Sequence, residues 1–128
     1  MGATRIDGNA CGAAVEAALA ERIAALPSPP HLAVVIVGDD PASHVYVGAK
    51  ERACARLGIR STRIDIAADA EYAEVVATVQ RLNADPDVNG ILVQSPLPSG
   101  MDEIAITDLI DPIKDVDGFH AQNLGRLV

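Results

Sequence analysis

The sequence predicts an α/β fold: a three-layer domain in which a mostly parallel sheet is flanked by helices. Two observations predict it. Apolar runs of strand length alternate along the chain with longer segments whose apolar residues recur at helical spacing. The first of these runs, residues 32–37, is apolar at every position, which is typical of a strand buried on both faces. Because parallel strands need crossover connections, the intervening helices are expected on both faces of the sheet.

Four elements are expected in the first half of the chain. A helix over 11–26 ends at a proline-rich stretch, and the buried strand over 32–37 follows. The next helix is expected to be capped by Ser43 and to end before the glycine at position 58. Residues 59–66 alternate between polar and apolar side chains, which predicts a second strand.

The second half is expected to hold two helices and one strand. A helix over 69–83 carries an apolar stripe, and a short apolar strand follows over 88–93. Two prolines in 94–98 prevent further strand pairing there. A short helix is expected over 102–110, and the tail from 111 onward is predicted to be polar and rich in turns.

Composition excludes several classes of protein. With 128 residues, 49% of them hydrophobic, the chain suits one folded domain over 1–128. A net charge of −8 and three aromatic residues argue against nucleic-acid binding. Two cysteines without metal-ligand spacing predict neither a disulfide scaffold nor a metal site. No apolar stretch is long enough to span a membrane and none reads as a signal peptide, so a cytoplasmic setting without membrane contact is expected.

Ligands of parallel α/β sheets bind beyond the carboxyl ends of the strands, which draws attention to residues 38–50, 94–98 and 114–126. Tyr46 and Lys50 are four positions apart, so they share one helix face. A lysine beside a tyrosine on a partly apolar face is suited to acid–base catalysis, although a solvent-exposed lysine on an ordinary helix fits the same spacing.

Gln94 and Asp117 are the other polar candidates. Gln94 directly follows an expected strand, where it either orients a neighbouring ammonium or simply closes the strand as a surface amide. Asp117 lies in an acidic tail that lacks the distal Glu of an EF-hand, so a calcium site is not expected. Its carboxylate can grip an amidine-like group through two hydrogen bonds, or else belong to a solvated loop. Five basic residues in 50–63 form either a solvated helix face or a surface for an anionic substrate tail.

No dinucleotide-binding or P-loop motif follows any expected strand. The first turn between strand and helix reads G-D-D-P-A-S, and it lacks the glycines that allow close approach of a pyrophosphate.

Three motifs resemble one enzyme family in order and spacing. Residues 37–50 read V-G-D-D-P-A-S-x-x-Y-x-x-x-K, residues 90–98 read G-I-L-V-Q-x-P-L-P, and residues 112–127 read P-x-K-D-V-D-G-F-H-x-x-N-x-G-R-L. Together they resemble the N-terminal catalytic domain of the bifunctional methylenetetrahydrofolate dehydrogenase/methenyltetrahydrofolate cyclohydrolase family, over nearly the whole chain.

The resemblance implies a role in one-carbon metabolism and roles for individual residues. Lys50 matches the catalytic lysine of the cyclohydrolase step, Gln94 the glutamine that tunes it, and Tyr46 the tyrosine that stacks on the folate. Asp117 matches the acid that holds the amino-pyrimidine edge of the pterin, and Ser43 a position at the rim of the site. The implied substrate-binding residues are Ser43, Tyr46, Lys50, Val93, Gln94, Ser95, Pro96 and Asp117.

The resemblance also implies what this chain does not contain. In the family a Rossmann domain binds NADP and forms most of a homodimer interface, and we expect that half to be missing here. The isolated chain is then expected to be a monomer without hydride-transfer activity. Ser95 departs from the pattern, since the family usually has Leu there, and Ala121 stands where Pro is frequent.

Two alternatives belong to other classes. A receiver-type signalling module fits the length and the acid pair after the first strand, but Gln94 stands where its phosphorylated Asp belongs. An interaction domain without a site is the other alternative, favoured if folates do not bind.

Overall fold

Three parallel strands form the centre of the molecule, in the order β2-β1-β3. The computed structural model describes residues 3–128. The central strand β1 (His31–Val37) pairs along its whole length with β2 (Arg60–Ile66), from His31 opposite Arg60 to Val37 opposite Ile66. On its other side β1 pairs with the shorter β3 (Gly90–Val93). The predicted third strand therefore begins two residues later than expected.

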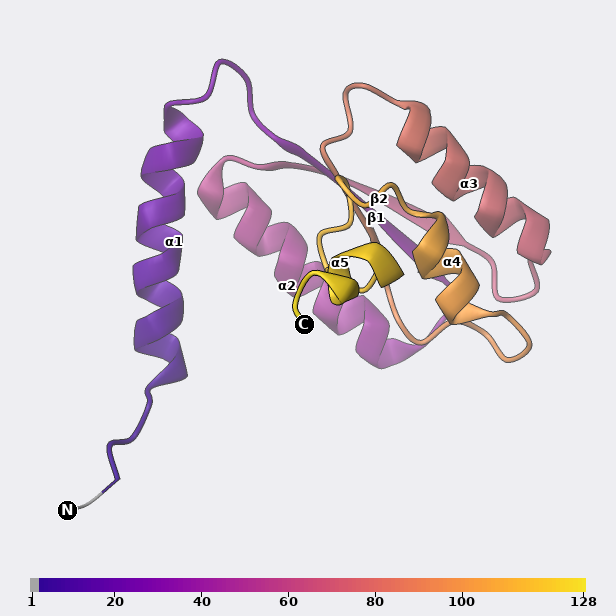
Figure 1. The fold of residues 1–128 in the computed structure, drawn as a ribbon, viewed down its shortest axis with the longest axis horizontal. Helices are drawn as coiled ribbons and strands as arrows, with labels where there is room; N and C mark the ends of the chain where they lie inside the picture. The colour runs from indigo at the N-terminus through magenta and orange to yellow at the C-terminus, as the bar shows by residue number, and fades with distance from the viewer. Residues whose placement is uncertain (1–2) are drawn as a thin grey trace.

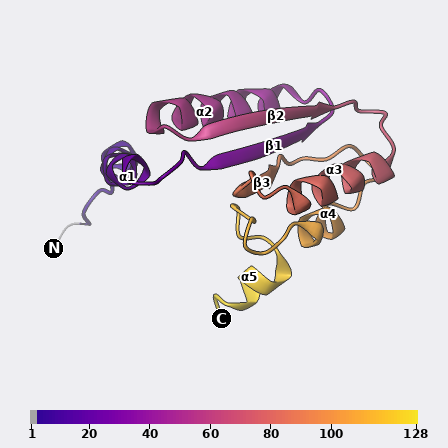
Figure 2. The ribbon, with the colours of Figure 1, turned by 90° about the horizontal axis from the view of Figure 1, so that it is seen from above.

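Helices cover both faces of this sheet, as Figure 2 shows. One face carries α2 (Pro41–Leu57). The opposite face carries α3 (Tyr72–Ala84), on which α4 (Glu103–Leu109) packs. The predicted three-layer α/β architecture is confirmed.

The pleat of β1 divides the core in two. Val34 and Ile36 pack with Val47 of α2 and Leu92 of β3 on one face. The alternate residues of β1 face α3 and α4 in the larger cluster, which consists of Ala33, Val35, Val37, Ile66, Val75, Val79, Leu82, Val88, Ile91, Ile106 and Ile110. Successive strand residues point to opposite faces, so the continuous apolar run supplies both clusters.

The N-cap predicted for α2 is wrong. Asp40 caps the helix instead, and its side chain accepts a hydrogen bond of 2.8 Å from the backbone N–H of Ser43. Pro41 then occupies the first turn, where its missing N–H costs nothing. The hydroxyl of Ser43 is thereby left for another partner.

The first helix, α1 (Gly8–Ala24), begins earlier than predicted because Asp7 caps it. It lies apart from the sheet and is adjacent to α2 (Figures 1 and 2). None of its residues is buried. An exposed ion pair of 2.9 Å between Glu16 and Arg56 joins the two helices.

The tail was expected beyond the carboxyl ends of the strands, but it starts beside the amino end of β3. Ile91 forms a parallel bridge with Asp115, and its N–H donates to the carbonyl of Lys114 at 2.7 Å. A Cβ at Gly90 would lie 2.6 Å from Val116, so glycine permits this close approach. The tail also contains α5 (Ala121–Gly125), a short helix that the sequence analysis did not predict.

Candidate active site

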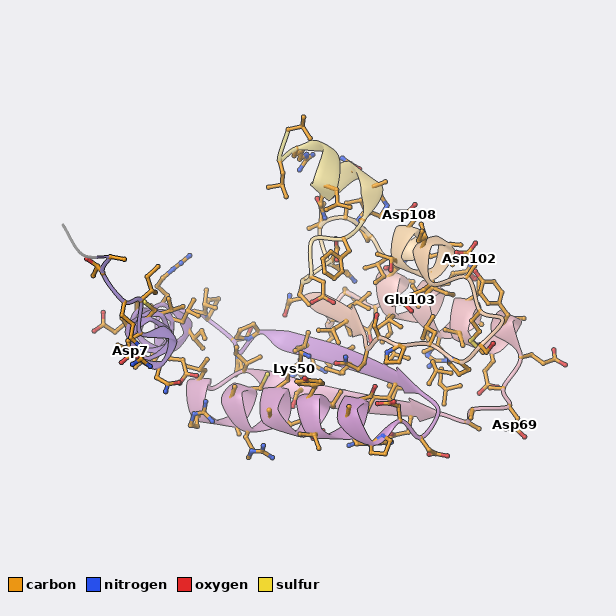
Figure 3. The ribbon with its side chains drawn as sticks, turned by 90° about the horizontal axis from the view of Figure 1, so that it is seen from below. Asp7, Lys50, Asp69, Asp102, Glu103 and Asp108 are labelled. Carbon is orange, nitrogen blue, oxygen red and sulfur yellow. The ribbon has the colours of Figure 1, made fainter. Side chains whose placement is uncertain are left out.

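Lys50 and Gln94 meet at the centre of the candidate site. The ammonium of Lys50 donates a hydrogen bond of 3.0 Å to Oε1 of Gln94, and both side chains are half-buried. Gln94 follows β3 and lies two residues after Leu92, so both side chains point to the same face of the sheet. The side chain of Leu92 packs in the cluster with α2. The pleat therefore directs the glutamine toward α2, and Figure 3 shows Lys50 on the side of that helix facing the sheet.

Tyr46 lies one helical turn before Lys50 on α2. Its side chain is 60% exposed, so the ring is available to a ligand. Residues four apart on a helix are surface neighbours, and the aromatic ring and the ammonium therefore border the same space.

Ser43 lies one turn nearer the start of α2 and is buried. Its hydroxyl donates to the carbonyl of Ser95 at 3.3 Å. The side-chain amide of Gln94 donates to the same carbonyl at 2.8 Å. This one carbonyl therefore joins α2 to the loop that follows β3.

Asp117 lies in the tail, near enough to Lys50 for the two charges to interact. It keeps an exposed surface, but desolvation raises the pKa of its carboxyl. The positive charge of Lys50 opposes this increase in pKa, and the negative charge of Asp115 adds to it. The arrangement thus holds a carboxyl group, an ammonium and an amide together, with an exposed aromatic ring beside them.

Asp115 anchors the loop that carries Asp117. Burial opposes ionisation of Asp115, but hydrogen bonds from the Asn123 side chain and from the backbone N–H groups of His120 and Gly118 outweigh it and lower the pKa. The donor–acceptor distances are 2.9 to 3.0 Å. Asp115 was not singled out by the sequence analysis, although it lies inside the acidic tail motif.

The loop after β3 forms the wall of the site. It follows the half-buried Val93, the last residue of β3, and it includes the exposed Ser95 and Pro96. A cis peptide bond joins Ser95 to Pro96. The hydroxyl of Ser95 donates to Glu103 at the start of α4. The same carboxylate accepts a hydrogen bond of 3.3 Å from the N–H of Leu97. Glu103 was also missed, because no local pattern links it to a loop several residues earlier.

The comparison with known families matches residues 6–117 to "Tetrahydrofolate dehydrogenase/cyclohydrolase, catalytic domain". This segment includes Ser43, Tyr46, Lys50, Gln94 and Asp117. The chain belongs to this family.

Relatives in the tetrahydrofolate dehydrogenase/cyclohydrolase family match almost the whole chain. "Bifunctional protein FolD" of Acidiphilium cryptum is 54% identical over 127 residues, which is 99% of this chain and 46% of that protein. The protein of the same name from Parasynechococcus marenigrum is 53% identical over 130 residues, covering 98% of this chain and 44% of the relative. The chain therefore spans about half the length of the curated relatives it matches.

Solved structures of the family share the fold. The Campylobacter jejuni bifunctional FolD enzyme superposes with a TM-score of 0.92 at 40% identity, covering 94% of this chain and 44% of that one. The Trypanosoma brucei dehydrogenase-cyclohydrolase, solved with NADP cofactor and inhibitor, gives 0.91 at 33% identity and covers 98% of this chain and 44% of that one. The receiver-type alternative is not supported.

The start of α2 does not fit the pyrophosphate of the NADP that the Trypanosoma structure holds. A dinucleotide pyrophosphate binds free N–H groups at the start of a helix. At α2 the Asp40 carboxylate already accepts from the backbone N–H of Ser43, and Pro41 has no N–H to offer.

Within residues 3–128, no group of three or more metal-ligating side chains is placed to hold a metal ion. No helix in that described range is both long and apolar enough to cross a membrane.

Three of the five basic residues in 50–63 are paired with carboxylates. Arg56 pairs with Glu16, Arg60 with Asp87 at 2.7 Å, and Arg63 with Asp65 at 2.7 Å. Glu16 lies on α1 and Asp87 lies in the turn before β3, whereas Arg63 and Asp65 both belong to β2. A landing surface for an anionic tail stays a prediction.

Proposed function

We propose that this chain is the folate-binding catalytic part of an enzyme of one-carbon metabolism. The whole enzyme would oxidise methylenetetrahydrofolate to methenyltetrahydrofolate with NADP and hydrolyse that product to 10-formyltetrahydrofolate. The hydrogen bond between Lys50 and Gln94 carries the proposal, and the charge interaction between Lys50 and Asp117 supports it. The names of the solved structures that this chain resembles state both activities, dehydrogenase and cyclohydrolase.

Lys50 would be the acid–base group of the hydrolytic step. Water must attack the bridging carbon of the folate, and protons must then be moved between water, nitrogen and carbonyl oxygen. A positioned side chain that carries such protons accelerates a reaction by about 10²–10⁴-fold. Gln94 would hold the ammonium in place through its oxygen, at the observed 3.0 Å.

The remaining side chains would bind and orient the folate. The carboxylate of Asp117 would accept two hydrogen bonds from the amino-pyrimidine edge of the pterin, a geometry that favours carboxylate partners. The exposed ring of Tyr46 would stack on the folate, and Val93, Ser95 and Pro96 would form the wall beside it. The isolated chain would bind this small molecule as a monomer, in the cytoplasm.

The proposal is tested by isothermal titration of the chain with 10-formyltetrahydrofolate. We expect saturable binding with one site per chain, and a decrease of about ten-fold or more in affinity for Asp117→Asn, since a charged hydrogen bond contributes roughly 1.5–3 kcal/mol. Asp69→Asn is the matched control, because it removes the same charge from an exposed position far from Lys50 (Figure 3). Absence of binding by the parent chain would overturn the proposal.

A further inference from the structure

Ser43 is too enclosed to be an ordinary ligand-binding side chain. Only 2% of its surface is exposed. Its backbone N–H is held by Asp40 at 2.8 Å, and its hydroxyl proton is directed at the carbonyl of Ser95. Residues 43 and 95 come from different layers of the fold, so the hydroxyl connects the first turn of α2 to the loop after β3.

The carbonyl of Ser95 also determines which way the Gln94 amide faces. A glutamine amide presents an acceptor oxygen on one side and a donor nitrogen on the other. Here the nitrogen donates to the Ser95 carbonyl at 2.8 Å, which leaves the oxygen facing the ammonium of Lys50. The opposite orientation would place two donors against each other and the amide oxygen against a carbonyl oxygen.

We propose that Ser43 is a positioning residue that acts through the Ser95 carbonyl to keep the oxygen of Gln94 directed at Lys50. The carbonyl has two lone pairs, and Ser43 and Gln94 use one each. The catalytic meaning of this role rests on the proposed function, whereas the positioning itself concerns only side chains of this chain.

A second tether makes the Ser95 carbonyl a fixed point. The hydroxyl of Ser95 donates to Glu103, and Glu103 also accepts from the N–H of Leu97. The loop is therefore held by α4 on one side and by Ser43 of α2 on the other. Without the hydroxyl of Ser43, the carbonyl remains tied to α4 only, and the Gln94 amide gains freedom to turn.

The test measures how fast the lysine ammonium protons exchange with water, by NMR of the ¹⁵N-lysine-labelled chain. The sequence has two lysines, so two signals report on Lys50 and Lys114 separately. We expect Ser43→Ala to increase the exchange rate of Lys50 about five-fold, as fits the loss of one ordered hydrogen bond. Gln94→Leu should increase it at least as much, because it removes the acceptor itself.

The double variant decides whether Ser43 acts through Gln94. If it does, the ammonium protons of Lys50 exchange no faster in the double variant Ser43→Ala/Gln94→Leu than in Gln94→Leu alone. Additive increases would overturn the proposal, as would an unchanged rate in Ser43→Ala. Thr78→Val is the control for the loss of a buried hydroxyl, because Thr78 lies on α3 at the opposite face of the sheet. It should leave the exchange rate of Lys50 unchanged. All of these variants should leave the exchange rate of Lys114 unchanged.

If Ser43→Ala does not fold, Ser43→Cys takes its place, since it keeps the size and replaces the hydroxyl with a weak donor. The exchange measurement needs no ligand. Its failure therefore overturns the positioning role, whereas failure of the parent chain to bind 10-formyltetrahydrofolate overturns the proposed function alone.

Discussion

A single ammonium group, that of Lys50, connects the polar side chains of the site, since it donates to Gln94 and its charge acts on Asp117. An ordinary surface lysine would extend into water. The 3.0 Å contact with a glutamine across the interface between helix and sheet distinguishes Lys50 from that case. This contact is the basis for the first prediction at the residue scale.

Lys50→Met should abolish most of the cyclohydrolase activity and spare more of the dehydrogenase activity. Methionine keeps the apolar stem but removes the proton carrier, and hydride transfer depends more on orientation than on a proton carrier here. The experiment uses a chimera in which this chain replaces the matching part of the Acidiphilium cryptum relative. We expect cyclohydrolase turnover to decrease by about 10²-fold or more.

Arg52→Met is the matched control, because Arg52 is an exposed cation on the same helix. It should change neither activity. If Lys50→Met leaves cyclohydrolase turnover within about three-fold of the parent chimera, Lys50 has no catalytic role.

Asp117 shows a conflict between stability and binding. Its pKa is raised in the fold, so the folded state holds this proton more readily than the unfolded state. Stability from this group is therefore present at acidic pH and is lost as the pH rises through the raised pKa. Asp117→Asn should increase the melting temperature by about 2 °C at pH 7 while weakening folate binding.

The gain in melting temperature of Asp117→Asn should shrink as the pH is lowered toward about 4, where a carboxyl group in the unfolded chain also becomes protonated. Calorimetric melting curves of the two proteins across this pH range provide the measurement. A stability gain that is constant with pH would show that the charge of Asp117 is not its source.

At the scale of secondary-structure elements, Lys114 ties the tail to the end of α3. Its ammonium donates to the backbone carbonyls of Leu82, Asn83 and Asp85, at 3.1, 2.8 and 2.7 Å. These carbonyls lie at the C-terminal end of α3 and just beyond it, where the helix dipole favours a cation. The neighbouring bridge between Asp115 and Ile91 then sets the course of the tail toward the site.

Lys114→Met should destabilise the chain by about 2 kcal/mol, because half-buried carbonyls lose a charged donor. Urea unfolding measures the change. Lys50→Met is the matched control, since it makes the same substitution where the acceptor is a single side chain, that of Gln94. It should lower the free energy of unfolding by less than Lys114→Met does. A loss below about 0.5 kcal/mol for Lys114→Met would contradict the capping role.

At the scale of the whole molecule, the chain is short beside the relatives that it matches. It spans 46% of the Acidiphilium cryptum relative, and the start of α2 is occupied by its own cap. We therefore expect this chain to show no saturable binding of NADP.

Titration calorimetry with NADP tests this prediction. The full-length Trypanosoma brucei relative, whose structure holds NADP, is the positive control. Saturable binding of NADP by the chain alone at micromolar concentrations would show that a site for the cofactor exists within these residues.

Local signals determined most of the order of the elements. The apolar run of β1 and the helical spacing before Gly58 depend on neighbours in the chain, so period and turn residues suffice to find them. The short α5 was missed, because contacts beyond its own five residues hold it. Asn123, for example, donates to the carbonyl of Pro112 and to Asp115.

The sequence by itself also marked Tyr46, Lys50, Gln94 and Asp117, through spacing and a family resemblance, but it left open whether Lys50 was a surface lysine. Only the tertiary structure placed the ammonium of Lys50 3.0 Å from Gln94, because the pleat of β3 directs residue 94 toward α2. It also assigned the cap to Asp40 and gave the Ser43 hydroxyl a partner 52 positions away. Periodicity is a property of adjacent residues, whereas a choice between competing hydrogen-bond partners depends on which distant segments the fold brings together.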